Sequence, residues 1–524
     1  MFGVDGANIE DLTDALHVHP GISGVLAKHE FAAAAMADGY SRASGGVGVV
    51  ASTSGGGALN LIAGLGESYT SRTPVLALVG QVPVSLDGLG AFQDTSGRGG
   101  SLDAVKLFSA VSVYCRRVVD PADIGALLSE ALAATRRGGP AVLLLPKDVQ
   151  QRDVHVPADA WASTPSRTPD PVALADVIRR TTGRIAIVAG DQVARDDARA
   201  ELAALREALG AAVMTAPDAK DVVIGAPVTG VMGHPGAVAA VRDAEVCLLV
   251  GTRLPAMARA GIEDALAWTL TLSIGADLPY LPAIHVGSDD LRRSLARLTE
   301  LVRDRPPTPS TAPPPSVLRP PDHHGPGIRY ADAMAVLDDE LPDGADVVAD
   351  AGNTGAAAIH LLPARRDGRF VVALGMGGMG FSFGAAIGMC FARGRRTVVV
   401  AGDGSFFMHG MELHTAVQYG LPITAVLFNN NAHAMCVTRE QLLFADESGH
   451  NRFTTSMLGA GLAAMFPGLP SVDVADADAL RTAVRAALTT DGPSVISVDC
   501  SADEIPPFAP FLTIKESTRV TASA

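Results

Sequence analysis

The chain has 524 residues, of which 48% are hydrophobic and 19% are charged, and its formal net charge is −15. This length predicts about two to four domains with ample core. The negative charge argues against binding to nucleic acid or to an anionic membrane surface. Five cysteines are scattered singly, and no basic segment followed by an apolar one opens the chain. These features are typical of a cytoplasmic protein without disulfides.

Two breaks divide the sequence into three segments, each about the size of one domain. The first break lies near 151–171, and the second, 304–327, is rich in proline and predicts an extended linker. We therefore expect a first domain over 1–155, a middle domain over 165–303 and a third domain over 328–515.

Short apolar runs alternate with helical patterns in all three segments. Examples in chain order are "VGVVAST", "PVLALVG" and "AVLLLP", then "RIAIVAG" and "VCLLVGT", then "RTVVVAGDG" and "PITAVLFNNN". Buried strands separated by helices predict parallel sheets covered on both faces. The expected fold class is three consecutive α/β domains, with ligands at the carboxyl ends of the strands.

One uncharged segment, 371–392, is long enough to span a bilayer. Glycines interrupt it repeatedly, however, and such a pattern favours a strand, a glycine turn and a buried helix. We expect no membrane span.

The strongest local motif is "GDGSF", followed by "NNN" after the next strand. A strand ends just before Gly402, Asp403 and Gly404, which turn into a helix, and the next strand delivers Asn430. A crossover of this kind brings both loops to one edge of a parallel sheet. Carboxylate, amide and carbonyl oxygens suit Mg²⁺, and a helix N-terminus suits a diphosphate. The alternative is an ordinary turn in which Asp403 caps the helix.

This motif resembles the diphosphate-binding motif of thiamine-diphosphate-dependent enzymes. The resemblance implies that Asp403, Asn430 and the carbonyl of Ala432 bind Mg²⁺. It also places further residues in the cofactor site, namely Gly404, Ser405, His433, Met435, Asn353 and Thr354.

In the first segment, "AKHEFAAAAMADGYSRASG" resembles the acetolactate synthase stretch that contains the catalytic glutamate. The resemblance implies that Glu30 is the catalytic carboxyl group, which shares a proton with the aminopyrimidine ring of the cofactor in a mostly apolar setting. The alternative is that Glu30 only favours a helix N-terminus and pairs with Lys28 or His29.

Other motifs of the first segment follow in the order of the same family. They are "TSGGGALN", in which Gly56 stands where a proline is usual, then "GQVP", "GAFQD" and "LPKDV". The resemblance implies that Phe92 and Gln93 are catalytic residues that line the active site.

The glycine-rich stretch "LGMGGMGFSFGAAIG" permits two interpretations. Gly375, Gly377 and Gly380 form a formal G-x-G-x-x-G, and Asp403 follows about 20 residues later, as in a dinucleotide site. An NAD- or FAD-dependent oxidoreductase is therefore a rival hypothesis, but Asp403 cannot serve both motifs. The family resemblance implies instead that Met379 is the catalytic residue that bends the cofactor, and that the Gly377 carbonyl holds its 4′-amino group. The alternative for Met379 is core packing.

The middle segment is similar to the flavin-binding region of acetolactate synthases in "GVMGHPGAVAAV" and "LLVGTR". The acidic pair expected after the next strand is missing, because the sequence there reads "LSIGADLPYL". We therefore favour a protein without FAD over one that binds it, and any bound flavin would have a structural role.

Arg439 and His433, which follow Asn430 in the sequence, are candidates for substrate contacts. The acetolactate synthase branch has a tryptophan at the position of Arg439, and an arginine there suits an anionic substrate group. The alternative for Arg439 is a surface ion pair with Glu440. His433 contacts the diphosphate, acts as an acid or base, or does neither.

The resemblance as a whole implies decarboxylation of a 2-oxo acid, such as pyruvate, and transfer of the acyl unit to a second carbonyl compound. A simple decarboxylase similar to benzoylformate decarboxylase is the runner-up, and a cofactor-binding homologue without catalysis is a third possibility. Because Glu30 and Asp403 lie in different domains, the family arrangement implies a homodimer or homotetramer with active sites between subunits. The opening "MFGVDGAN" corresponds to the end of the first strand of the family, so we expect the native protein to start upstream.

Overall fold

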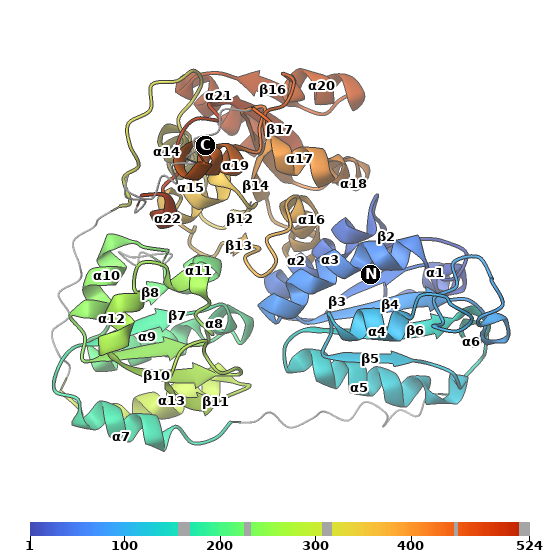
Figure 1. The fold of residues 1–524 in the computed structure, drawn as a ribbon, viewed down its shortest axis with the longest axis horizontal. Helices are drawn as coiled ribbons and strands as arrows, with labels where there is room; N and C mark the ends of the chain where they lie inside the picture. The colour runs from blue at the N-terminus through green and yellow to red at the C-terminus, as the bar shows by residue number, and fades with distance from the viewer. Residues whose placement is uncertain (156–167, 225–231, 307–316, 445–448, 513–524) are drawn as a thin grey trace, which may run out of the picture.

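The computed structural model describes residues 1–155, 168–224, 232–306, 317–444 and 449–512. They form three α/β domains, drawn in blue, green and orange to red in Figure 1. Part of the predicted proline-rich linker lies outside the described residues, and its described part, from Val317 onward, contains no helix or strand before Tyr330.

The first domain has a six-stranded sheet in the order β2-β1-β3-β4-β6-β5, and all of its strand pairs are parallel. Its strands are β1 Phe2–Val4, β2 Val25–Leu26, β3 Gly48–Ser52, β4 Val75–Gln81, β5 Tyr114–Arg117 and β6 Pro140–Pro146. Its helices are α1 Glu10–Val18, α2 Glu30–Ser44, α3 Gly56–Ser71, α4 Ala104–Ser109, α5 Ile124–Arg136 and α6 Lys147–Gln150, with 3₁₀ turns η1 Val84–Leu86 and η2 Pro121–Asp123.

The middle domain has a five-stranded parallel sheet in the order β11-β10-β9-β7-β8. Its strands are β7 Ile185–Ala189, β8 Ala212–Thr215, β9 Val246–Val250, β10 Leu270–Gly275 and β11 Ile284–Gly287. Its helices are α7 Val172–Arg180, α8 Gln192–Arg195, α9 Arg199–Leu209, η4 Pro217–Val222, α10 Pro235–Arg242, α11 Ala256–Arg259, α12 Glu263–Trp268 and α13 Leu291–Val302.

The third domain has a six-stranded parallel sheet in the order β13-β12-β14-β15-β17-β16, which repeats the order of the first domain. Its strands are β12 Asp346–Ala349, β13 Phe370–Val372, β14 Thr397–Gly402, β15 Ile423–Asn429, β16 Ser471–Val474 and β17 Ser494–Asp499. Its helices are α14 Tyr330–Glu340, α15 Asn353–Leu361, α16 Phe381–Arg393, α17 Asp403–His409, η5 Gly410–Glu412, α18 Leu413–Gln418, α19 Ala434–Arg439, η6 Glu440–Phe444, α20 Leu458–Met465, α21 Ala477–Leu488 and α22 Ala509–Leu512.

The apolar runs singled out in the sequence are the central strands of these sheets, so the predicted fold class is confirmed. All residues of β6 and β15 are buried, as expected for strands covered on both faces. The uncharged segment 371–392 forms most of β13, a glycine turn and α16. Within the described part of the chain, no helix combines the length and the apolar character that a membrane crossing requires.

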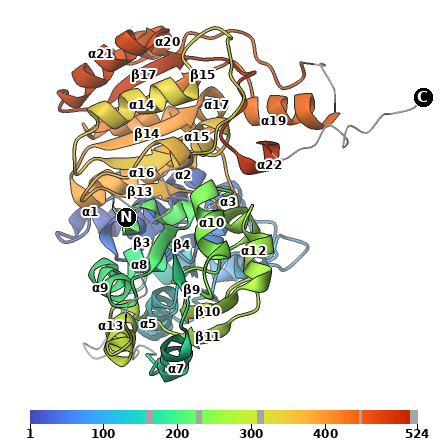
Figure 2. The same cartoon turned by 90° about the vertical axis from the view of Figure 1, so that its left-hand side faces the viewer.

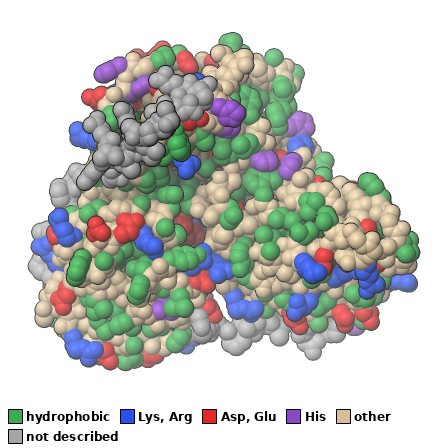
Figure 3. Space-filling model, in the orientation of Figure 1, with side chains coloured by type: hydrophobic (Ala, Val, Ile, Leu, Met, Phe, Trp, Pro, Cys, Tyr) green, Lys and Arg blue, Asp and Glu red, His purple; other side chains and the backbone are tan. Residues whose placement is uncertain are grey.

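The first and third domains pack through α2 and α16, which lie side by side in Figures 1 and 2. A Cβ on Gly39 of α2 would collide with the backbone of Ala385, and one on Gly388 of α16 with the backbone of Met36. The backbones of the two helices therefore touch, which only small residues permit. Over the face in Figure 3, acidic and basic side chains are mixed, so this face has no broad field of one sign.

Lys220 in η4 joins the middle domain to the third. Its buried ammonium group donates to the carbonyls of Ala358, Ile359 and Leu362 at 3.0, 2.6 and 2.5 Å and lies 4.5 Å from the ring centroid of Phe370. These carbonyls belong to the C-terminal end of α15, where the helix dipole favours a cation. Burial nevertheless lowers the pKa of Lys220 to about 7.

We expect Lys220→Met to lower the free energy of unfolding by about 1–3 kcal/mol, because the last carbonyls of α15 lose a buried donor while the aliphatic stem is kept. Urea unfolding followed by circular dichroism measures the change. Lys106→Met is the control, since its ammonium group is exposed on α4 and its loss is expected to cost less than about 0.5 kcal/mol. Equal effects of the two substitutions would contradict a special role for Lys220.

Candidate active site

A cavity of about 290 Å³ lies at the carboxyl edge of the third sheet, beyond the ends of β12, β14 and β15. Loops gather at this edge in parallel sheets, which is where the sequence predicts the chemistry. The residues that line the cavity all belong to the third domain and are Ala351, Gly352, Asn353, Thr354, Met379, Gly402, Asp403, Gly404, Ser405, Met408, Asn430, Ala432, His433, Ala434, Met435 and Cys436.

Asp403 is the first residue of α17 and is almost fully buried. Its Oδ1 accepts the backbone N–H of Gly404 at 2.9 Å, and the N–H groups of Asn431 and Ala432 also point toward the carboxylate. Its Oδ2 makes no hydrogen bond of normal geometry among the described residues. Burial raises the pKa of Asp403 to about 6. A buried carboxylate oxygen without a partner is costly unless a cation binds it, so Asp403 is more than a helix cap.

The loop after β15 brings a second oxygen ligand to the same cavity. Asn430 lies in the lining, and its Oδ1 accepts the backbone N–H of Ala432 at 3.1 Å. Asn431 has a φ of 53°, a left-handed conformation that asparagine tolerates, and turns the chain at this point. One carboxylate, one amide oxygen and backbone carbonyls fit Mg²⁺ that is shared with phosphate oxygens. In the described segments, no group of three or more His, Cys, Asp or Glu side chains is arranged as a metal site.

Asp350 orders this cavity and was not predicted from the sequence. It is buried after β12, and its carboxylate accepts the backbone N–H of Gly380 at 3.0 and 3.1 Å and that of Ser382 at 3.0 Å. The hydroxyl of Ser405 donates to Asp350 at 2.7 Å. Ser405 therefore lines the cavity with its hydroxyl proton already donated to Asp350, and its contact with a diphosphate stays a prediction.

Three side chains predicted to contact the cofactor border the cavity. Met379 is only partly buried and lies in the lining, so core packing does not describe it. Met435 lies in the lining as well. His433 packs edge-on against Phe453 at 4.7 Å, and its Nδ1 is buried without a hydrogen-bond partner in the described chain. That nitrogen is available to a ligand.

Asn353 and Thr354 begin α15 and are both buried in the cavity wall. The Nδ2 of Asn353 donates to the Thr438 hydroxyl at 3.1 Å, and its Oδ1 is buried without a partner in the described residues. The N-terminus of α15 thus faces the cavity together with that of α17. Two helix N-termini at one cavity favour an anion such as a diphosphate.

The glycine turn between β13 and α16 has the strand-turn-helix context of a dinucleotide site, but its amides are taken. The N–H groups of Gly375, Met376 and Gly377 donate to the Glu67 carboxylate at 3.1, 2.6 and 3.3 Å. Gly380 donates to Asp350. A pyrophosphate would find carboxylates on the amides that it needs, so the dinucleotide interpretation of this turn is wrong. Gly377 itself is exposed and is not in the cavity lining.

Glu30 begins α2 in the first domain and is buried. Its Oε2 accepts from the Nδ2 of Asn60 at 2.9 Å. The alternative of an ion pair with Lys28 or His29 is wrong, because Lys28 donates its ammonium group to Gln418 at 3.0 Å and His29 caps α2 through the N–H of Phe31. Glu30 is therefore a buried carboxyl group with one amide partner.

Gln93 and Phe92 lie in the loop after β4. Gln93 has a φ of 62°, in the left-handed region that glutamine rarely adopts, and its Oε1 accepts from the Thr53 hydroxyl at 3.4 Å. Backbone strain of this kind often marks a functional position. Phe92 is 79% exposed. A phenylalanine side chain this exposed to solvent is suited to a contact with another molecule, such as a second copy of the chain.

The predicted site thus falls into two parts. Asp403, Asn430 and their neighbours surround the cavity, whereas Glu30, Phe92 and Gln93 do not line it. The cavity wall contains no residue of the first domain.

Arg439, the predicted anion-binding residue, is exposed at the end of α19 and does not line the cavity. Within the described residues it makes no ion pair with Glu440, whose carboxylate accepts from the Nδ2 of Asn451 instead. The ion-pair alternative is therefore not realised among the described residues, and a contact of Arg439 with an anionic substrate stays a prediction.

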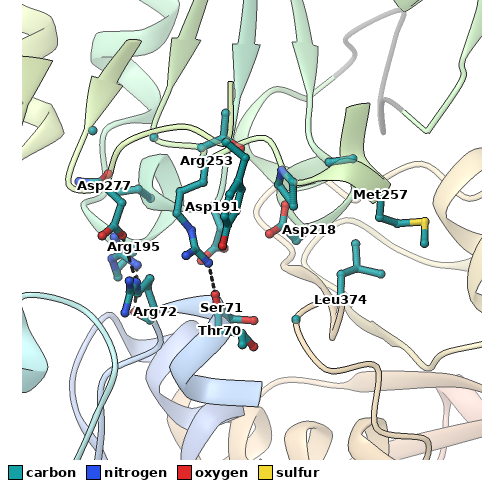
Figure 4. A pocket seen from close by; sticks show the side chains of 18 residues that line it. Thr70, Ser71, Arg72, Asp191, Arg195, Asp218, Arg253, Met257, Asp277 and Leu374 are labelled. Atoms are coloured by element: carbon teal, nitrogen blue, oxygen red, sulfur yellow. Dashed lines mark hydrogen bonds and ion pairs between the residues drawn. The ribbon is translucent and has the colours of Figure 1, made fainter. Parts of the chain in front are cut away.

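A second cavity, of about 190 Å³, lies where the three domains meet at the carboxyl edge of the middle sheet. Figure 4 shows Arg72 of the first domain facing Asp277 of the middle domain, with Leu374 of the third domain opposite. Arg72 and Asp277 form an ion pair at 3.2 Å, and the Arg253 guanidinium donates to the carbonyl of Thr70. These contacts close one side of the cavity.

Comparison with protein families accounts for all three domains. The family "Thiamine pyrophosphate enzyme" matches with its N-terminal TPP binding domain at residues 1–99, its central domain at 173–274 and its C-terminal TPP binding domain at 350–498. The acetolactate synthase large subunit of Parasynechococcus marenigrum is 30% identical to this chain over 95% of it and 84% of the relative. The chain belongs to the thiamine-diphosphate-dependent enzymes of the acetolactate synthase type. The predicted family is confirmed.

Two further matches agree with this family. The large subunit of acetolactate synthase isozyme 2 from Escherichia coli is 28% identical over 96% of this chain and 93% of the relative. The crystal structure of benzoylformate decarboxylase from Polynucleobacter necessarius superposes with a TM-score of 0.81 at 21% identity and covers 96% of both chains. The latter likeness concerns the fold alone.

The left-handed backbone at Gln93 makes a prediction that is independent of any cofactor. We expect Gln93→Gly to be more stable than Gln93→Val by about 1–2 kcal/mol, because glycine adopts this conformation freely and a β-branched residue does not. Urea unfolding of the two variants gives the difference. Equal stabilities would mean that residue 93 relaxes out of the left-handed region.

Proposed function

We propose that the protein uses thiamine diphosphate and Mg²⁺ to decarboxylate a 2-oxo acid and to transfer the resulting acyl unit to a second carbonyl compound. The observation behind this is the partnerless Oδ2 of Asp403, buried in a cavity with Asn430 and two helix N-termini. The names of the related acetolactate synthase large subunits support transfer over simple decarboxylation.

The protein's part in holding the cofactor is electrostatic. Asp403, Asn430 and the carbonyl of Ala432 would hold Mg²⁺, which in turn binds the diphosphate. The backbone amides at the start of α15 and α17 line the same cavity and would bind the phosphate oxygens. When bound, the cofactor supplies a nucleophilic carbon and a cationic ring that accepts electrons as CO₂ leaves.

Glu30 holds the proton that the aminopyrimidine ring exchanges. Its partner Asn60 supplies an N–H to one carboxylate oxygen, which leaves the other oxygen for the ring. Met379 lies at the cavity wall and would be the apolar residue against which the cofactor packs. Gln93 and Phe92 lie on the first-domain side, where the acceptor would enter.

The two parts of the site meet between subunits in this proposal. No first-domain residue lines the cavity of its own chain, so the Glu30 that serves it comes from a second copy. We therefore propose a homodimer or a dimer of dimers. The same arrangement places the exposed Phe92, and Arg439 at the end of α19, at the subunit boundary.

The test is product analysis with magnesium, thiamine diphosphate and pyruvate, alone and with candidate 2-oxo acid or aldehyde acceptors. We expect a coupled hydroxyketone product, detected by mass spectrometry. Asp403→Asn is expected to raise the Kd of the cofactor at least about 100-fold, because a charged metal ligand is lost. Glu30→Gln is expected to keep cofactor binding and to lose product.

Aldehyde without any coupled product would make the protein a decarboxylase, similar in activity to the runner-up. Absence of cofactor binding by calorimetry, under conditions in which a related acetolactate synthase binds, would remove the proposal altogether.

The middle domain is expected to take no FAD. FAD is larger than thiamine diphosphate, yet the cavity at the edge of the middle sheet, at about 190 Å³, is smaller than the cavity of about 290 Å³ next to Asp403. Its wall is joined by the Arg72–Asp277 ion pair, which FAD would have to break.

We accordingly predict that the purified protein lacks flavin absorbance in the visible range and that added FAD gives no thermal shift. Arg72→Ala tests whether the Arg72–Asp277 ion pair excludes FAD, since the substitution removes the pair and widens the cavity. Stoichiometric flavin in the wild-type protein would contradict this prediction without affecting the role of Asp403.

A further inference from the structure

Two buried glutamates cross the interface between the first and third domains in opposite directions. Glu412 of the third domain binds backbone of the first, and Glu67 of the first domain binds backbone of the third. Each is 2% exposed. Neither belongs to the cavity wall, and neither has a part in the proposed chemistry.

Glu412 binds the backbone directly before Glu30. Its Oε1 and Oε2 accept the N–H of Lys28 at 3.0 and 3.2 Å, and the N–H of His29 also points to this carboxylate. The hydroxyl of Thr415 donates to the Glu412 Oε1 at 2.6 Å, which fixes the rotamer of the carboxylate. The turn that starts α2 is therefore held from outside its own domain.

His409 adds a second contact from the same part of the third domain. Its ring stacks on Phe31 with centroids 4.2 Å apart and packs edge-on against His29 at 5.0 Å. The residues before and after Glu30 thus both touch His409, the last residue of α17. The helix that begins at Asp403 ends against the segment that contains Glu30.

Glu67 of the first domain binds the glycine turn of the third domain in the same way. Its carboxylate accepts the N–H groups of Gly375, Met376 and Gly377, two to four positions before Met379. The Ser71 hydroxyl donates to the Glu67 Oε1 at 2.6 Å. The turn has no regular secondary structure of its own, so this carboxylate replaces the hydrogen bonds that a helix or sheet would supply.

The likeness of the two sheets explains the reciprocity. Both domains have the same strand order, and α2 and α16 follow the corresponding strands β2 and β13. The two helices pack against each other, so the turn before each helix lies next to the opposite domain. Glu67 lies on the helix that follows β3, and Glu412 on the helical segment that follows the corresponding strand β14.

We propose that Glu412 and Glu67 are positioning residues, Glu412 for the activating carboxyl group of Glu30 and Glu67 for Met379, which lines the cofactor site. This inference rests on the proposed function. Small displacements of a catalytic group cost about 100-fold in rate for about 1 Å, so holding these turns matters to the reaction even though neither glutamate touches the cofactor.

The test uses the full-length protein and compares Glu412→Gln and Glu67→Gln with Asp346→Asn. Asp346 is the control, because it is fully buried and accepts the backbone N–H of Arg369 at 2.7 Å, but it lies at the opposite, amino end of β12. It also pairs with Arg393 at 2.9 Å, as Glu67 does with Arg42 at 3.9 Å, so it matches Glu67 most closely. All three substitutions remove a buried charge that binds backbone amides.

Two measurements separate positioning from general stability. Backbone amide exchange followed by mass spectrometry, without cofactor, should show at least about tenfold faster exchange at residues 28–31 in Glu412→Gln and at residues 375–377 in Glu67→Gln, but at neither in Asp346→Asn. With thiamine diphosphate and magnesium bound, Glu412→Gln should slow exchange of the C2 proton of the cofactor at least about tenfold while the Kd changes less than about threefold. Glu67→Gln should raise the Kd at least about fivefold.

The inference would be overturned if the C2 proton exchanged in Glu412→Gln at the wild-type rate. It would also be overturned if the changes in amide exchange and Kd in the two glutamate variants equalled those in Asp346→Asn. Either outcome would leave the proposed function intact. Wild-type protein that binds no thiamine diphosphate would instead overturn the proposed function, and the positioning roles with it.

Discussion

The contact of α2 with α16 is the constraint on which the rest of the structure depends. Because Gly39 and Gly388 let the two backbones touch, the separation of the first and third sheets is fixed by main chain and not by flexible side chains. Glu30 is the first residue of α2, and Met379 lies in the turn before α16. The segment at the start of each helix consequently packs against the opposite domain. Its conformation is set by the hydrogen bonds that the opposite domain makes with it.

Buried carboxylates show how the protein distinguishes structure from chemistry. Asp350, Glu67 and Glu412 are all buried, and each is satisfied by backbone N–H groups and a serine or threonine hydroxyl. Asp403 is equally buried, yet one of its oxygens has no partner in the described residues. The buried Asp221 and Asp346 also have an oxygen without a hydrogen bond, but each pairs with an arginine, and no arginine or lysine of the described residues pairs with Asp403. Since an unpaired buried charge is expensive, Asp403 is the carboxylate that supports the proposed cation site.

Much of this arrangement could be predicted from the sequence, because strand patterns and the Asp403–Asn430 motif are local. The interface glutamates could not be predicted, since Glu412 and Glu67 act on segments more than 300 positions away and no spacing rule connects them. The shared strand order of two domains was equally hidden, because it leaves no repeat in the sequence. The dinucleotide pattern misled for a physical reason: it specifies the glycine turn correctly but not which anion occupies its amides.

The middle domain has the sheet edge at which α/β domains bind ligands, but protein groups of its neighbours meet there. Arg253 donates to the first domain, Arg72 enters from that domain to pair with Asp277, and Lys220 ends a helix of the third. Arg369 of the third domain pairs in the same way with Asp221, at 2.6 Å. The charged side chains at this edge therefore make contacts between domains, and these contacts occupy groups that could otherwise bind a ligand. The middle domain thus holds the C-terminal end of α15 through Lys220, and the opposite end of the same helix, at Asn353 and Thr354, lines the cavity of the third domain.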